Sequence, residues 1–144
     1  MNTSKSEAQV QQGVELLRAQ SQEFAKRATG LSETLSSVEK WLIELEGKVE
    51  ANVPMEGDLV LRFERVGQTW RLAVNAYNKQ KQLIGSSPLA TATVESKIKA
   101  AKNLPALVAR MAELHAERMA EIVEAQKVLA DMGVATATSG KGGA

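Results

Sequence analysis

The composition of this chain limits the chemistry that it can perform, since it contains one histidine and no cysteine. His115 lies one helical turn after Met111 in an apolar stripe, and Arg118 follows three residues later. A metal site needs more imidazole or thiolate ligands, and a catalytic histidine needs a nucleophile and an orienting carboxylate. The sequence marks neither arrangement. We interpret His115 and Arg118 as a polar layer that sets helix register, and we expect no enzyme activity, cofactor, metal or small-molecule substrate.

Charge is segregated along the chain, although the net charge is only +1. Residues 1–58 carry −4, residues 59–104 carry +6, and the remainder carries −1. The basic segment 62–102 suits a phosphate backbone, and Tyr77 is available to stack on a base. One alternative function is therefore that of a nucleic-acid-binding accessory protein, with contacts from Arg62, Arg71, Lys79, Lys81, Lys97, Lys99 and Lys102. The opposing interpretation is that these are solvated helix lysines, and arginines that pair with Glu64.

Residues 59–76 have the pattern of an antiparallel β-hairpin. Gly67-Gln68 suits a two-residue type II′ turn, because glycine readily adopts the positive φ that its first central position requires. This turn pairs Val66 with Thr69 and places Glu64 opposite Arg71 on a polar face. The same register gathers one apolar face, made of Leu59, Leu61, Phe63, Trp70, Leu72 and Val74.

A heptad of apolar residues precedes the hairpin and predicts a long coiled-coil-like helix over about residues 7–52. The intervals alternate between four and three residues, which is typical of a coiled-coil seam. The positions of this stripe are Val10, Val14, Leu17, Ser21, Phe24, Ala28, Leu31, Leu35, Val38, Leu42, Leu45 and Val49. Pro54 is expected to end the helix, because proline disfavours helical conformation in the preceding residue.

The segment after the hairpin predicts a kinked helical region that ends in a tail. Ser87-Pro88 suits a helix start, which gives a first helix over about 88–102. Pro105 predicts a kink or break, with a second helix over about 104–132 that stops at Gly133. Residues 137–144 are expected to form a flexible, glycine-rich tail.

These elements predict a mostly helical α+β fold in a single domain of residues 1–136. In it, the C-terminal helix pairs antiparallel with the first helix, and the hairpin caps one end or folds back on it. A hairpin between two helical arms resembles the layout of prefoldin, a cytosolic chaperone whose subunits pair helical arms and assemble through hairpins. That resemblance implies chaperone function as a second alternative, although the connection 77–87 and Pro105 depart from it.

The apolar face of the hairpin leads to the main functional expectation. Six large side chains represent too much buried free energy to remain in water, at about 1.5 to 3 kcal/mol each. We therefore expect this face to be an interaction surface that a second chain helps to cover, so that the protein is at least a dimer. The expected function is that of a non-enzymatic protein-interaction or scaffold protein. Without a signal-peptide pattern or a long apolar segment, we expect a cytoplasmic location and no membrane association.

Overall fold

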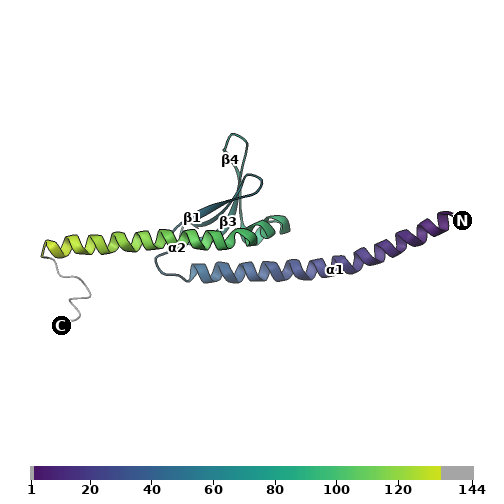
Figure 1. The fold of residues 1–144 in the computed structure, drawn as a ribbon, viewed down its shortest axis with the longest axis horizontal. Helices are drawn as coiled ribbons and strands as arrows, with labels where there is room; N and C mark the ends of the chain where they lie inside the picture. The colour runs from purple at the N-terminus through teal and green to yellow at the C-terminus, as the bar shows by residue number, and fades with distance from the viewer. Residues whose placement is uncertain (1, 134–144) are drawn as a thin grey trace.

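The computed structural model describes residues 2–133, which form two long helices around a four-stranded antiparallel sheet (Figure 1). The predicted class, mostly helical α+β, is confirmed. The strands lie in the order β1-β2-β3-β4. In chain order the elements are α1 (Asn2–Ile43), β1 (Ala51–Met55), β2 (Leu59–Val66), β3 (Thr69–Tyr77), β4 (Leu83–Pro88), the 3-10 turn η1 (Leu89–Thr91) and α2 (Val94–Asp131). The predicted tail, 137–144, lies outside the described residues.

The hairpin register is confirmed. Strands β2 and β3 pair Val66 with Thr69, Glu64 with Arg71, and Phe63 with Leu72. Gly67 has a φ of +63°, as the first central position of a type II′ turn requires. The turn geometry and the alternation of apolar and polar residues therefore fixed this part of the sheet together.

The predicted extent of the first helix, to residue 52, is wrong. Helix α1 ends at Ile43, and the chain turns through Gly47, which has a φ of +66°. Residues 51–55 then form edge strand β1, whose Ala51 pairs with Phe63 of β2. Proline is tolerated there because an edge strand leaves one side of its backbone without a hydrogen-bonding strand. Burial of Ala51 and Met55 on the apolar face of the sheet favours the strand over two further helical turns.

The prediction of two C-terminal helices is also wrong in its boundaries. Ser87 and Pro88 end strand β4, in what was predicted to be a polar connection and a helix start. Helix α2 begins instead at Val94, where the Thr93 hydroxyl oxygen accepts a hydrogen bond from the Ser96 backbone nitrogen at 3.1 Å. The stop at Gly133 is confirmed, since its φ is +84° and α2 ends at Asp131.

Helix α2 runs through Pro105 without interruption. A proline inside a helix removes one backbone hydrogen bond and costs about 3 kcal/mol. Pro105 itself lies on the exposed side of the helix, while the buried side chains of α2 lie on both sides of it in the sequence. Burial of these side chains offsets the cost of the proline: Ala100, Leu104, Leu107 and Met111.

The two helices run parallel, which corrects the predicted antiparallel pairing. The Lys97 ammonium nitrogen donates to the Ser32 hydroxyl oxygen at 2.9 Å near the start of α2. Further along both helices, the Nε2 atom of His115 lies 3.2 Å from the carbonyl oxygen of Glu46. Figure 1 shows both helices advancing in the same direction. The physical reason is packing on the sheet, because both helices contribute buried side chains to the same core cluster: Leu35 and Leu42 from α1, and Leu104 and Leu107 from α2.

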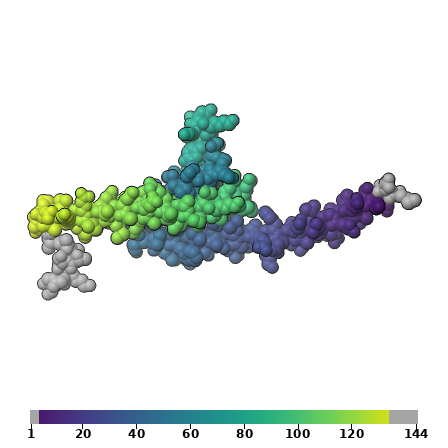
Figure 2. Space-filling model, in the orientation of Figure 1, coloured from purple at the N-terminus to yellow at the C-terminus, as the bar shows by residue number. Residues whose placement is uncertain are grey.

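One face of the sheet packs against both helices to form the core. Leu35 and Leu42 of α1 meet the buried side chains of α2 and of the sheet. Glu39 attaches α1 to β3, because its carboxylate accepts a hydrogen bond from the Leu72 backbone nitrogen at 2.8 Å. We call this compact part the body: the sheet, η1, residues 28–43 of α1 and residues 94–115 of α2. The sheet rises from the helices on one side of the molecule (Figure 2).

Candidate interaction surfaces

The apolar face of the hairpin is core, which corrects its prediction as an interaction surface. Leu61, Phe63 and Leu72 have no exposed surface, and Val74 is buried. Leu59 and Trp70 are partly buried against the same cluster, with the Trp70 ring stacked on Phe63 at a centroid distance of 5.1 Å. The chain's own helices cover this face. The hairpin therefore needs no second chain to cover this face.

The opposite face of the sheet holds the two arginines of the predicted anionic-partner surface. The Glu64 carboxylate lies 2.9 Å from Nη2 of Arg71 and 3.6 Å from Nε of Arg62. The Nη2 atom of Arg62 also lies 3.9 Å from the Glu50 carboxylate. Both guanidinium groups are therefore neutralised by carboxylates of the same chain. These ion pairs weaken the attraction that the two arginines would exert on a phosphate.

The lysines of that predicted surface lie in other places. Lys97 contacts α1 through Ser32, whereas Lys99 and Lys102 line a hollow with Glu56 beside β1. Lys79 and Lys81 belong to the turn between β3 and β4, where Lys81 lines a second hollow with Asp58. The structure thus separates the seven basic residues among the sheet face, the start of α2 and a turn, with carboxylates in between.

A long exposed apolar surface lies on the segment of α1 that precedes the body. Every described side chain from Ser4 to Arg27 is exposed, and we call this segment the α1 arm (Figure 1). The heptad stripe that begins at Val10, which we call the α1 stripe, continues through it, yet Leu17 is 62% exposed and Phe24 is 60% exposed. The same stripe is covered in the body, where Leu35 is 4% exposed. One face of a single helix is therefore half core and half bare.

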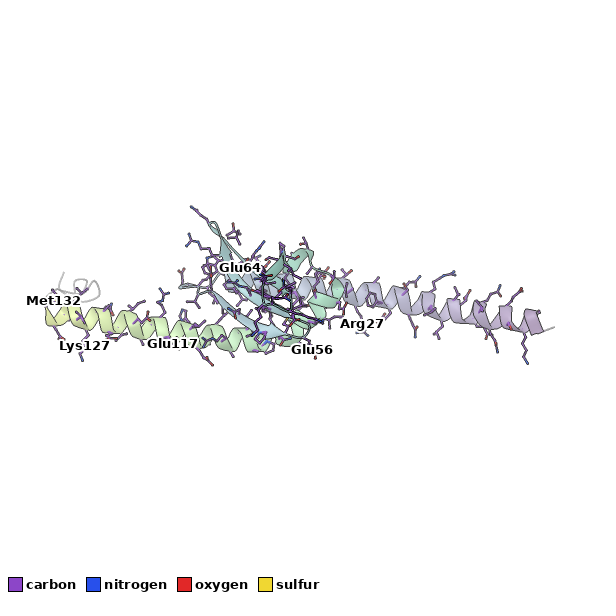
Figure 3. The ribbon with its side chains drawn as sticks, turned by 90° about the horizontal axis from the view of Figure 1, so that it is seen from above. Arg27, Glu56, Glu64, Glu117, Lys127 and Met132 are labelled. Carbon is purple, nitrogen blue, oxygen red and sulfur yellow. The ribbon has the colours of Figure 1, made fainter. Side chains whose placement is uncertain are left out.

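The final turns of α2 are bare in the same way. Residues 116–131, which we call the α2 arm, are all exposed, and Figure 3 shows Glu117, Lys127 and Met132 beyond the sheet. The large apolar side chains among and just after them, each about half exposed or more, are Met119, Ile122, Val123, Val128, Leu129 and Met132. The two arms leave the body in opposite directions (Figure 1).

An apolar groove of about 320 Å³ joins the body to the α2 arm. It lies between the loop after α1 and helix α2, and it is lined by Leu42, Leu45, Val49, Val108, Met111 and Met119 among others. His115 borders it and contacts the loop through the Glu46 carbonyl oxygen. Arg118 is exposed, and its Nε lies 3.8 Å from Glu121. The structure thus separates the pair predicted as one polar layer, because His115 contacts a loop and Arg118 faces solvent.

The loop that lines this groove depends on Gly47. A Cβ atom at this position would lie 3.1 Å from Nε2 of His115, and the φ of +66° disfavours any L side chain. We expect Gly47→Ala to lower the free energy of unfolding by about 1 to 2 kcal/mol, as measured by urea denaturation. The matched control is Gly30→Ala in α1, where nothing lies within 4 Å of the added atom. There the same change should stabilise by up to about 1 kcal/mol. Equal shifts in the two variants would contradict a special role for the loop conformation.

The loop 44–50, which lines the groove, and strand β4, which exposes apolar side chains elsewhere, were not predicted from the sequence. Gly47 is the signal that could have located the loop, because it interrupts the α1 stripe between Leu45 and Val49. Strand β4 exposes Leu83 and Ile84. Its sequence is short and contains two serines, so it lacks a clear strand pattern.

Residues 2–133 contain no group of three or more histidine, cysteine or acidic side chains that could hold a metal ion. In the same residues, no helix is long and apolar enough to cross a membrane. Comparisons with protein-family models, curated proteins and solved structures found no match.

Proposed function

We propose that this protein is a non-enzymatic scaffold that self-associates through its two helical arms. The observation that carries this proposal is the change in burial along the α1 stripe. The apolar positions keep their intervals of four and three residues from Val10 to Leu42, but only those in the body have a partner. A stripe with this spacing suits pairing with another helix.

The energetics of the arms support the need for a partner. Most helix stability in proteins comes from packing of an apolar face, and isolated helices are marginal in water. The α1 arm also contains Gly13, which weakens a helix by about 1 kcal/mol relative to alanine. Burial of Val10, Val14, Leu17 and Phe24 in a helix pair would supply the missing stabilisation.

The proposal predicts that one substitution on the bare stripe separates the copies without unfolding them. Leu17→Asp places a carboxylate in the helix contact and removes about 1.5 to 3 kcal/mol of apolar burial. We expect the apparent dissociation constant to rise at least about tenfold, since 1.4 kcal/mol corresponds to a factor of ten. The measurement is molar mass by analytical ultracentrifugation across a dilution series.

The matched control is Ala19→Asp, which adds the same charge two residues away, on the outward side of α1. It should associate like the wild-type chain. Circular dichroism should report the same helicity for both variants at low concentration, because neither side chain is buried in the single chain. Equal weakening by the two substitutions would contradict a specific role for the stripe.

The nucleic-acid alternative has less support, because the ion pairs of Arg62 and Arg71 and the separation of the lysines leave no continuous basic surface among them. The chaperone alternative rested on a layout that the structure does not have. Strands β1 and β4 flank the hairpin, and the helices run parallel.

A further inference from the structure

The parallel direction of the two helices determines how a second copy can reach both arms. Ser32 of α1 is level with Lys97 of α2, and Glu46 is level with His115. Helix α2 therefore extends past the end of α1 on one side, and α1 begins well before α2 on the other. Among residues 2–133, no element lies beside most of each arm along the line that the other helix would follow if it were longer; beside α2 this stretch begins after the loop 44–50 (Figure 1).

The two helices have nearly the same length, 42 and 38 residues. A second copy that is shifted along the helix axis by one helix length, roughly 60 Å, would place its α1 arm beside the α2 arm of the first copy. Its own α2 would then begin just beyond the end of the first copy's α2. A copy turned end for end cannot pair both arms in this way, because its α1 would have to occupy the line of the first copy's α1.

We propose that copies of this chain join head to tail, with the α1 arm of one copy packed parallel to the α2 arm of the next. This inference rests on the proposed self-association and adds the partner arm, its direction and the open form of the assembly. In a head-to-tail pair, one copy keeps a free α1 arm and the other keeps a free α2 arm. Further copies can therefore bind, and the assembly grows unless it closes into a ring.

Charge favours this pairing over the pairing of like arms. The α1 arm has four basic and three acidic residues, whereas the α2 arm, residues 116–131, has two basic and four acidic residues. The charged residues that flank the stripe of the α1 arm are Arg18 and Arg27, of which Arg27 lies 2.8 Å from Glu23. Glu121 flanks the apolar face of the α2 arm. The net charge is +1 for the α1 arm (four basic minus three acidic residues) and −2 for the α2 arm (two basic minus four acidic residues), so net charge opposes the pairing of like arms and favours the pairing of unlike arms.

The heptad spacing allows registers that differ by seven residues, and one of them also aligns opposite charges. With Val14 beside Ile122, Leu17 lies beside Ala125 and Val10 lies beside the aliphatic stem of Arg118. In a parallel pair, Arg18 and Glu121 then occupy the flanking positions that form interhelical ion pairs. In this register, residues 4–7 of the arriving α1 come level with 112–115, where the loop 44–50 contacts His115, so this first turn must leave the line of the helix. One heptad earlier, Val10 would meet that loop too.

The deciding experiment mixes two variants that each lose a different arm. Leu17→Asp disables the α1 arm, and Ile122→Asp disables the α2 arm at a position that is 52% exposed in the single chain. Each variant alone should sediment as a monomer at micromolar concentration. An equimolar mixture should give a species of two chains and nothing larger, because only one pair of intact arms remains. Association of either variant alone, or a monomeric mixture, would overturn the α1-on-α2 contact.

The molar mass of the wild-type chain, measured against concentration, distinguishes a wrong head-to-tail contact from an absence of self-association. Its mass should grow beyond two chains as concentration rises. A mass that stops at two chains would overturn the open assembly and leave self-association intact. A monomer at every concentration would overturn the proposed self-association itself.

Cysteine cross-linking tests the direction and register of the contact. The introduced cysteines are the only thiols present, because the chain has no cysteine of its own. A Val10→Cys chain mixed with an Arg118→Cys chain should form an interchain disulfide on mild oxidation. A Val10→Cys chain mixed with a Leu129→Cys chain should form it at least tenfold more slowly, since residues 118 and 129 lie about 16 Å apart along the helix. Faster cross-linking to Leu129→Cys would mean an antiparallel contact or a parallel contact in another register, and either would overturn the proposed pairing of Val10 with Arg118.

Discussion

Replacement of Leu35 by aspartate should largely destroy the docking of α1 on the sheet. The Leu35 side chain is buried between the two helices and the sheet, close to the hydrogen bond that joins Glu39 to Leu72. Loss of a buried leucine typically costs 2 to 5 kcal/mol, and an unpaired buried carboxylate adds to this. We expect a loss of about 4 kcal/mol or more, which is a large part of the 5 to 15 kcal/mol typical of a folded domain.

The measurement is urea denaturation followed by circular dichroism. Leu17→Asp, studied at a concentration where the chains are dissociated, is a close control because it makes the same change in the same stripe of the same helix. Its free energy of unfolding should stay within about 0.5 kcal/mol of the wild-type value, as for other exposed positions. If the two variants unfold at the same urea concentration, the boundary between the body and the α1 arm is misplaced.

Replacement of Phe63 by alanine should remove the largest side chain of the core. Phe63 has no exposed surface, pairs with Leu72 across the hairpin and stacks on Trp70. Deletion of a buried phenylalanine typically costs 3 to 5 kcal/mol, because the surrounding side chains only partly fill the cavity. We expect the free energy of unfolding to fall by about that amount, with a red shift of Trp70 fluorescence as its ring loses the stacked partner.

Val66→Ala is the matched control, since Val66 lies on the same strand but is 49% exposed at the turn. It should change the free energy of unfolding by less than about 1 kcal/mol. Trp41, on the exposed side of α1, contributes a constant background that a Trp41→Phe parent chain removes. A Phe63→Ala chain as stable as the Val66→Ala chain would show that the hairpin face is not the centre of the core.

Several features of the fold were encoded locally and could be predicted from the sequence. Gly67 set the turn, and the alternation around it set the hairpin register, because a slip of one residue would exchange the two faces of the sheet. Gly133 ended α2 because glycine adopts a positive φ at low cost. The spacing of the α1 stripe likewise identified which face of the first helix is apolar.

The candidate surface was predicted only in part. The sequence pattern identifies an apolar face, but it does not identify the segment that packs on that face. The faces of the hairpin and of the α1 stripe were both recognised as apolar. The structure covers the hairpin with its own helices and leaves Val10, Val14 and Leu17 bare. The apolar surface that is open to a partner therefore lies on the arms and not on the sheet.

The sequence by itself determined turns, faces and the apolar spacing of the helices, since these depend on residues that lie within a few positions of one another. Only the tertiary structure decided the direction of α2, the continuity of that helix through Pro105 and the conversion of residues 51–55 into strand β1. Each of these depends on packing between segments that are far apart in the chain. Burial of Ala51 and Met55 on the sheet, and of Leu104 and Leu107 against it, outweighs the local preferences that pointed elsewhere.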